Sequence, residues 1–181
     1  MTRSGRMLFG VGLLALGGCG PRGMTPPGER SGSVRPSAGV QVTPAIPPAR
    51  VVAGQTLLVP IYSNIATADN ATAINLAVTL TVRNLDLAGP IVVQAIKYYD
   101  SGGRLVRSYL DDPIRIGPLA SIDLFVRESD NSGGSSPSFL VDWVAEQDVT
   151  PAQADAVMIS TAGTLGITLT SSGRVVATYR R

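Results

Sequence analysis

Residues 73–83 read Ala-Ile-Asn-Leu-Ala-Val-Thr-Leu-Thr-Val-Arg, with a large apolar side chain at every second position from Ile74 to Val82. Small or polar residues occupy the positions between them. Because successive side chains of a β-strand point to opposite faces of a sheet, this period of two predicts a strand with one face in a core and the other in solvent.

Similar signals extend in both directions from this segment. Upstream, Leu57, Val59 and Ile61 alternate, and Pro60 within that run predicts an edge strand because proline donates no backbone hydrogen bond. Downstream, residues 91–99 are β-branched and aromatic, and the following Asp-Ser-Gly-Gly predicts a tight hairpin that returns over 104–110. Further strands are predicted at 114–116, 121–128, 138–146, 156–161, 166–170 and 174–179, with a hairpin at Ser172-Gly173 and a helical turn at 151–156.

Eight or nine short strands therefore follow residue 51, with Gly, Pro and Asp between them. No helical pattern of about 10–15 residues separates them, which argues against a parallel α/β fold. The sequence predicts an all-β fold for residues 51–181, an antiparallel β-sandwich that is immunoglobulin-like. Within residues 138–146, the predicted core face is Phe139, Val141, Trp143 and Ala145, and Trp143 is the expected centre of the core.

The N-terminal residues 1–18 have the composition of a signal peptide that is removed. Arg3 and Arg6 precede ten uncharged residues at 7–16, which are too few for a membrane-spanning helix of roughly 20 residues. Leu16-Gly17-Gly18-Cys19 resembles the bacterial lipoprotein box, in which Cys19 is lipidated and becomes the first mature residue. The alternative is an ordinary secretory signal that happens to contain the chain's one cysteine.

Acylation of Cys19, with chains such as palmitate, would anchor the protein to a membrane, since two chains already give stable attachment. By the sorting rule for such lipoproteins, Gly20 in place of Asp indicates the outer membrane, facing the periplasm, rather than the inner membrane. Residues 20–50 contain seven prolines and five glycines without apolar periodicity. Residues 19–50 are therefore predicted to be the lipidated cysteine and a disordered tether, with a reach of about 30 Å.

Charge excludes one class of partner. Loss of Arg3 and Arg6 leaves 13 basic and 13 acidic residues, and residues 51–181 hold nine basic against 12 acidic. The predicted domain is therefore mildly acidic and lacks the basic surface that nucleic-acid binding requires. The tether is basic and either rests against anionic lipid headgroups or is simply a solvated linker.

Residue types also restrict the chemistry. The chain has no histidine, so it cannot form a Ser-His-Asp triad or the usual zinc site. Asp111 and Asp112 precede a proline and are typical of a turn. Glu128, Asp130 and Ser132 place oxygen atoms at alternate positions before two glycines, as in a calcium loop, but the closing position of that loop is Phe139. The alternative is a glycine-rich loop stabilised by Asx turns.

Aromatic residues amount to only 5% of the chain. They could line a patch for a small ligand, although packing within the core and on the sheets is the alternative that their positions in strands favour. The residues concerned are Tyr62, Tyr98, Tyr99, Tyr109 and Trp143.

Several runs resemble a bacterial lipoprotein family whose domain has no assigned function, over about residues 56–176. These runs are Val59-Pro60-Ile61-Tyr62-Ser63, residues 98–110 (Tyr-Tyr-Asp-Ser-Gly-Gly-Arg-Leu-Val-Arg-Ser-Tyr-Leu), Gly117-Pro118-Leu119-Ala120-Ser121, residues 128–134, Phe139-Leu140-Val141-Asp142-Trp143 and residues 158–163. The resemblance implies that the protein is a lipoprotein of the cell envelope and that it shares the fold of the family. It implies no activity.

We therefore expect a lipid-anchored lipoprotein of the bacterial cell envelope that acts as a non-enzymatic binding or interaction module. Its partners would be the membrane, through the N-terminal lipid, and an envelope protein or small ligand, without a cofactor. The alternative is a carboxylate-dependent hydrolase or calcium-binding domain centred on Asp111, Asp112, Glu128 and Asp130. Convergence of these four acids in one pocket would favour the alternative, and dispersal would favour the binding module.

Overall fold

The alternating segment at 73–83 forms two consecutive strands, β5 (Ala73–Asn75) and β6 (Ala77–Arg83), in the computed structural model, which describes residues 34–35, 38–161 and 166–180. Leu76, Val78, Leu80 and Val82 are all buried, and the residues between them are partly exposed. The period of two therefore separates core from solvent as expected.

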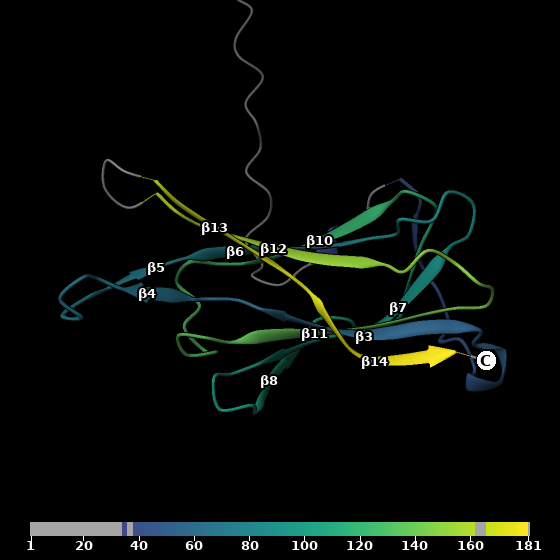
Figure 1. Cartoon of the computed structure of the whole chain (residues 1–181), viewed down its shortest axis with the longest axis horizontal. Helices are drawn as coiled ribbons and strands as arrows, with labels where there is room; N and C mark the ends of the chain where they lie inside the picture. The colour runs from purple at the N-terminus through teal and green to yellow at the C-terminus, as the bar shows by residue number, and fades with distance from the viewer. Residues whose placement is uncertain (1–33, 36–37, 162–165, 181) are drawn as a thin grey trace, which may run out of the picture.

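Two antiparallel sheets lie face to face and enclose the core (Figure 1). This arrangement confirms the predicted all-β sandwich. The five-stranded sheet has the order β1 (Val34–Arg35), β10 (Ser121–Val126), β6, β12 (Gln153–Ser160) and β13 (Ile167–Ser172). The seven-stranded sheet has the order β14 (Arg174–Arg180), β3 (Ala53–Pro60), β11 (Ser138–Ala145), β7 (Ile91–Tyr99), β9 (Ile114–Ile116) and β2 (Val40–Val42), with β8 (Leu105–Ser108) also paired to β7.

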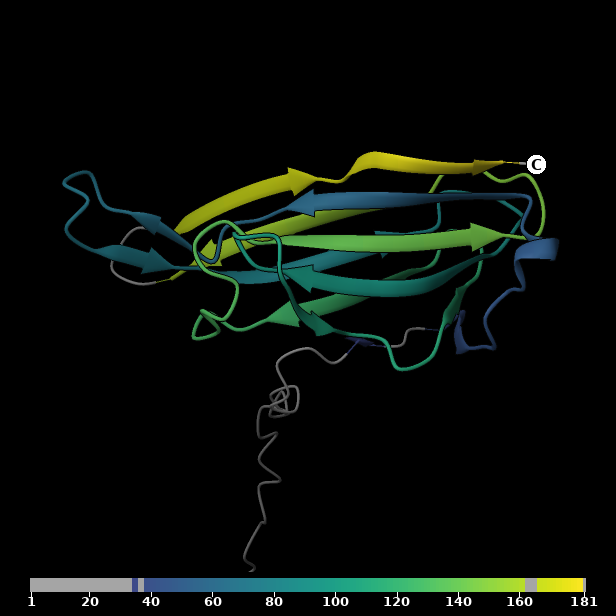
Figure 2. The ribbon, with the colours of Figure 1, turned by 90° about the horizontal axis from the view of Figure 1, so that it is seen from below.

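A separate hairpin of β4 (Asn64–Ala66) and β5 projects from one end of the sandwich (Figures 1 and 2). The hairpin predicted after residue 99 is confirmed, because β8 returns antiparallel to β7. The short strands β1, β2 and β4 were not predicted; β1 and β2 lie within residues 20–50, which show no apolar periodicity.

The core contains the expected aromatic residues. Trp143 is 2% exposed, and Tyr98 and Phe139 are fully buried. The Tyr98 and Phe139 ring centroids are 5.2 Å apart, and Tyr109 packs against both rings. Trp143 is therefore a core residue, as predicted, and shares the core with this aromatic group.

Three local predictions are wrong. β3 is not an edge strand, because it pairs with both β11 and β14, and Pro60 is its last residue, beyond the β14 register. The helical turn expected at 151–156 is absent, because β12 begins at Gln153 and buries Ala154, Ala156 and Met158 along one face.

The third error concerns Ser172-Gly173, which does not close a hairpin. Here the chain leaves β13 in one sheet and enters β14 in the other. The Gly173 N–H donates a 2.7 Å hydrogen bond to Ala154 O, and a Cβ at residue 173 would lie 2.9 Å from that oxygen. Glycine is needed because the backbone approaches β12 closely at this crossing.

Residues 43–52, which we call the strap, cross the outer face of the seven-stranded sheet near one end (Figure 2). Ile46 in the strap is buried against Val92 and Val144, and the strap includes the 3₁₀ helix η1 (Pro48–Arg50). Arg50 forms a 2.6 Å ion pair with Glu146. The folded domain thus extends into residues 40–50, which the sequence analysis assigned to the tether.

The predicted signal peptide and Cys19 lie outside the described residues. Within the part of the chain that is described, no helix is long and apolar enough to span a membrane.

Candidate functional site

The loop between β10 and β11 carries the residues considered for calcium. Asp130 accepts hydrogen bonds from the Ser132 N–H and hydroxyl, at 3.2 and 2.6 Å. It also forms an ion pair with Arg107 at 3.2 Å. Partial burial raises the pKa of Asp130, but the bonds from Ser132 and the charge of Arg107 outweigh it, so the net pKa lies below the usual value. The carboxylate is therefore engaged within the protein, in the Asx-turn arrangement.

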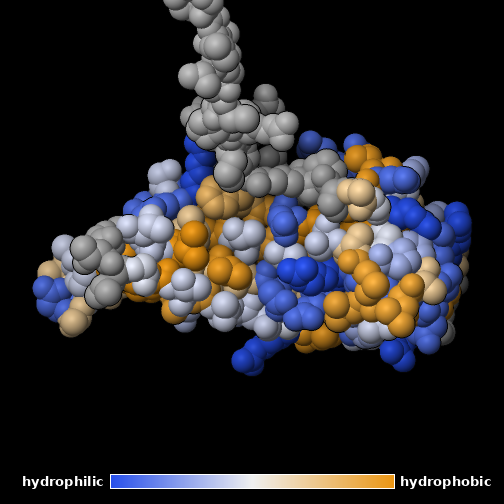
Figure 3. Space-filling model, turned by 90° about the horizontal axis from the view of Figure 1, so that it is seen from above, coloured by the Kyte–Doolittle hydropathy of each residue, from blue (hydrophilic) through white to orange (hydrophobic). Residues whose placement is uncertain are grey.

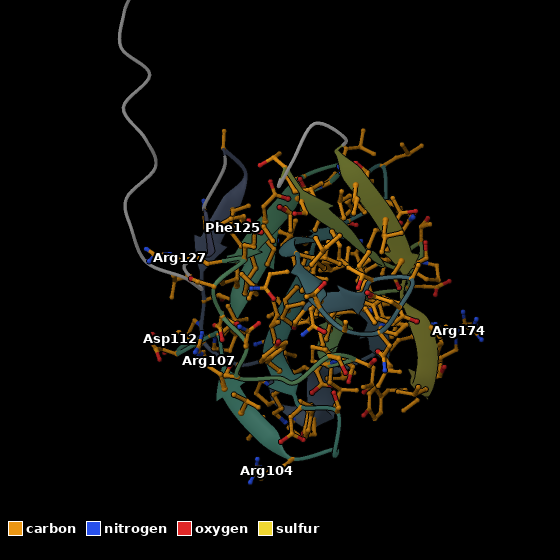
Figure 4. All side chains as sticks on the ribbon, turned by 90° about the vertical axis from the view of Figure 1, so that its left-hand side faces the viewer. Arg104, Arg107, Asp112, Phe125, Arg127 and Arg174 are labelled. Carbon is orange, nitrogen blue, oxygen red and sulfur yellow. The ribbon has the colours of Figure 1, made fainter. Side chains whose placement is uncertain are left out.

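The other candidate acids do not join Asp130 in a metal site. Glu128 lies 3.4 Å from the Ser160 hydroxyl, which donates to it, and Asp111 and Asp112 lie on an exposed turn before β9. No three acidic side chains of the described residues converge in a way that could hold a metal ion. Figure 4 shows Asp112 at the side of the sandwich that carries Arg107, with Arg174 at the opposite side.

The same loop is locked onto the hairpin between β7 and β8. The Ser101 N–H donates to Gly133 O at 2.9 Å, and the Ser101 hydroxyl accepts from the Ser136 N–H at 2.9 Å. Gly133 is buried against Tyr98, and a Cβ there would lie 2.7 Å from Tyr98 Cζ. These contacts join two of the runs that resemble the family, residues 98–110 and 128–134.

The tyrosines do not form a common patch. Tyr98 is buried and its hydroxyl lies 3.3 Å from that of Ser63, whereas Tyr62 is 49% exposed. Tyr109 is partly buried with the Arg107 guanidinium over its ring, and burial raises the pKa of Tyr109 to about 12. Packing is therefore the role of Tyr98 and Tyr109, whereas Tyr99 is partly exposed on β7. One further tyrosine was not singled out by the sequence analysis.

That tyrosine, Tyr179, belongs to a groove on the outer face of the seven-stranded sheet. The groove has a volume of about 750 Å³ and lies between the strap and β14. Such a volume is in the range of ligand-binding pockets. Its lining combines apolar residues with polar ones, namely Ile46, Pro48, Val51, Gln94, Ala95, Lys97, Asp142, Trp143, Val144, Thr178, Tyr179 and Arg180. We call it the strap groove.

A row of hydrogen bonds crosses the floor of the strap groove. Thr56 on β3 donates to Asp142 Oδ1 on β11 at 2.6 Å. Because this uses the Thr56 proton, the Tyr179 hydroxyl, 3.2 Å from Thr56 Oγ1, is the donor in their contact. Lys97 Nζ lies 3.9 Å from Asp142 Oδ2 and completes the row across β14, β3, β11 and β7. Two hydrogen bonds and one ion pair thus join the four side chains of this row.

Tyr179 lies beside a glycine, Gly54, in the neighbouring strand. The two residues are directly paired between β14 and β3, and Gly54 has no side chain to hold the tyrosine off the sheet. A Cβ at Gly54 would lie 2.7 Å from Trp143 O and 3.0 Å from Val144 Cγ1. An aromatic ring next to a glycine in a paired strand is a known way of restoring packing in a sheet.

The groove was missed by the sequence analysis, although its polar residues are visible as outward positions of strands. Lys97, for example, is a partly exposed residue of β7. The sequence did not reveal the strand order, which places β14 and β3 next to β11 and β7. Without that order, no pattern in the sequence brings Tyr179, Thr56, Asp142 and Lys97 together.

The outer face of the five-stranded sheet offers a different surface (Figure 3). Val157 and Ile159 of β12 are 41% and 42% exposed, and the register places Thr79, Thr168 and Thr170 beside them. Figure 3 shows apolar and polar atoms interspersed on this face. Its outward positions also include the charged residues Arg83, Asp123 and Asp155.

Comparison with known proteins gives a family and a distant structural likeness. Residues 54–176 match the family model described as "Protein of unknown function (DUF3124)". A crystal structure described as Thermotoga maritima 1070 is similar over 66% of this chain and 92% of its own chain, with 11% identity and a TM-score of 0.43. The search of curated proteins gave no match. Because the family model covers most of the chain, this protein belongs to the DUF3124 family, whose function is unknown.

Proposed function

We propose that this protein is a lipid-anchored module of the bacterial cell envelope, attached through Cys19, that binds an envelope partner without catalysing a reaction. The strap groove is the observation that carries the binding role, because it is open, partly apolar and lined by charged side chains. The lipoprotein box and the proline-rich segment after it support the attachment, since together they would hold the domain near a membrane surface.

The residues expected for the hydrolase or calcium-binding alternative support the binding role instead. Asp130 is committed to Arg107 and Ser132, and Asp111 and Asp112 lie on an exposed turn. A carboxylate-dependent hydrolase needs two carboxyl groups facing each other across a cleft. The strap groove has one acid, Asp142, among its lining residues.

Attachment is tested by Cys19→Ser in cells, with detergent partitioning and intact mass as readouts. The wild-type protein should partition into detergent and carry acyl mass on residue 19. The variant should remain an unlipidated precursor. A wild-type mature protein that begins elsewhere and lacks acyl mass would refute the anchor.

Binding is tested by photo-crosslinking in intact cells followed by mass spectrometry. A photoreactive amino acid at Tyr179, in the strap groove, should capture a specific envelope component. The matched control carries the same amino acid at Val157, on the outer face of the other sheet. Capture of the same components at both positions, or none at Tyr179, would contradict a binding role for the groove.

A further inference from the structure

A second pocket involves the projecting hairpin of β4 and β5 and shares no lining residue with the strap groove. Its volume is about 590 Å³, within the range of small-molecule sites. The hairpin and its turn line one side, and the end of the loop before β11 lines the other. We call it the hairpin pocket, and its lining residues are Tyr62, Asn64, Ile65, Ala66, Asn70, Ala71, Thr72, Ala73, Ser135 and Ser136.

Backbone hydrogen bonds hold the side of the pocket that carries Tyr62. The N–H groups of Ile61 and Ser63 donate to carbonyl groups of the loop before β11, at 3.0 and 3.1 Å. These two bonds continue the register between β3 and β11 and place Tyr62 directly opposite Ser136. Directly opposed residues of an antiparallel ladder point to the same face, so both side chains lie on the pocket side.

The turn of the hairpin is held by its own side chains. The Thr67 N–H donates to Thr72 O at 2.9 Å, and the Thr67 hydroxyl donates to Asp69 Oδ1 at 2.6 Å. Asp69 Oδ1 also accepts from the Ala71 N–H at 3.0 Å. The acid of this turn is therefore bonded within the turn, and both sides of the pocket are formed before a ligand arrives.

The polar groups of the hairpin pocket are neutral, since none of the described residues that line it is charged. Five of the lining side chains have polar groups that form no hydrogen bond with another described residue, namely Tyr62, Asn64, Asn70, Ser135 and Ser136. Amide side chains both donate and accept, and each hydroxyl group can do either. The pocket therefore suits an uncharged ligand whose own groups donate and accept, because an ionic ligand would find no counter-charge in the lining.

The apolar part of the lining narrows the ligand class further. Tyr62 is the aromatic residue of the lining and is 49% exposed. Apart from Ile65, the other apolar lining residues are alanines, which are too small to form the deep side-chain pockets that anchor a peptide. An exposed aromatic ring beside amide and hydroxyl groups matches a sugar, which has an apolar C–H face and hydroxyl groups around its rim.

We propose that the hairpin pocket binds a neutral saccharide. Tyr62 packs against the C–H face of one sugar ring, and Asn64, Asn70 and Ser136 exchange hydrogen bonds with its hydroxyl groups. This site goes beyond the proposed function, which rests on the strap groove.

The test exposes the full chain in detergent to an array of neutral oligosaccharides. The array holds α- and β-linked oligomers of glucose, galactose, mannose and N-acetylhexosamine, with matched oligomers that contain a uronic acid. The protein should bind neutral oligomers. Calorimetry with the best-bound neutral oligomer should give a Kd that changes less than about twofold between about 50 and 500 mM salt, because no ion pair contributes.

Two pairs of variants locate the site. Tyr62→Ala should weaken binding about tenfold or more, whereas Tyr62→Phe, which keeps the ring, should weaken it less than about threefold. Asn64→Ala should weaken binding about threefold or more, because its amide bonds are lost. Asn131→Ala is the matched control at an exposed asparagine outside the pocket and should change the Kd less than about twofold. An unchanged Tm in each variant shows that the fold is kept.

Three results would overturn the proposal. They are no binding of any neutral oligomer at about 1 mM, stronger binding of the uronic acid oligomers, and equal losses in Asn64→Ala and Asn131→Ala. Crosslinks from Tyr179 report on the strap groove alone, so failure of the saccharide site and failure of the proposed function are measured separately.

Discussion

The hydroxyl group of Thr56 donates a 2.6 Å hydrogen bond to the carboxylate of Asp142, and this bond joins β3 to β11 in the floor of the strap groove. Thr56 is only 6% exposed. The same hydroxyl accepts a bond from Tyr179 and so connects the edge strand β14 to the row. Three strands of one sheet are therefore linked by side chains as well as by their backbones.

Thr56→Val should lower the free energy of unfolding by about 1–2 kcal/mol, because a buried partner of a carboxylate is lost while the shape of the side chain is kept. Urea denaturation measures the change. The matched control is Thr81→Val, since Thr81 also donates to an aspartate, Asp123, on the neighbouring strand, but at an exposed site. The control should change stability by less than about 0.5 kcal/mol, and equal losses would contradict the role given to burial.

Gly133→Ala should destabilise the domain by about 1–3 kcal/mol, because its Cβ would overlap Tyr98 and Pro137, and buried Tyr98 has no room to move. Adding Tyr98→Phe should recover part of this loss, since it removes the hydroxyl group that the new methyl group meets. Gly166→Ala is the control, because its Cβ would have no neighbour nearer than 3.9 Å. Thermal unfolding of the wild-type protein, Gly133→Ala, Tyr98→Phe, the double variant and Gly166→Ala gives the comparison, and additive effects of the two changes would exclude the contact.

The ionisation of Asp86 should make the free energy of unfolding depend on pH in the acidic range. Hydrogen bonds from the backbone N–H groups of Gly89, Thr150 and Ala88 lower its pKa to about 2, against an ordinary value of 3.8. Above about pH 5 the carboxylate is ionised in both folded and unfolded chains, and its contribution to stability is complete. As the pH falls from about 5 to 2, the unfolded chain takes up the proton first, so this contribution is lost.

Asp86→Asn should therefore show a shallower fall in its urea midpoint between pH 4 and 2 than the wild-type protein. Asp112→Asn, on an exposed turn, is the charge-matched control. A slope as steep in Asp86→Asn as in the wild-type protein would show that other groups govern this range.

Calcium at millimolar concentration should leave the Tm unchanged. The oxygens of Asp130 are engaged by Arg107 and Ser132, and a calcium ion would have to displace the guanidinium group first. Thermal unfolding with added calcium or with a chelator measures this directly. An upward shift in Tm that disappears in Asp130→Asn would restore the calcium loop as a functional site.

The structure confirms most of the strands because their signal is local. Residues 73–83, 91–99 and 138–145 show their two faces in the order of their side chains alone. The hairpin signal of the glycines after β7 also depends only on neighbouring residues. The prediction failed at Pro60, at residues 151–156 and at Ser172-Gly173, where the outcome depends on which strands lie alongside.

The sequence by itself determined the strand faces, the core role of Trp143 and the lack of histidine chemistry, because each follows from residue types at neighbouring positions. The tertiary structure alone decided the strap groove. Its central bond joins residues 86 positions apart, and Tyr179 reaches Thr56 across 123 positions. Such contacts exist only after the strands have found their order, since pairing between distant strands is set by the packing of the whole sandwich and not by any one segment.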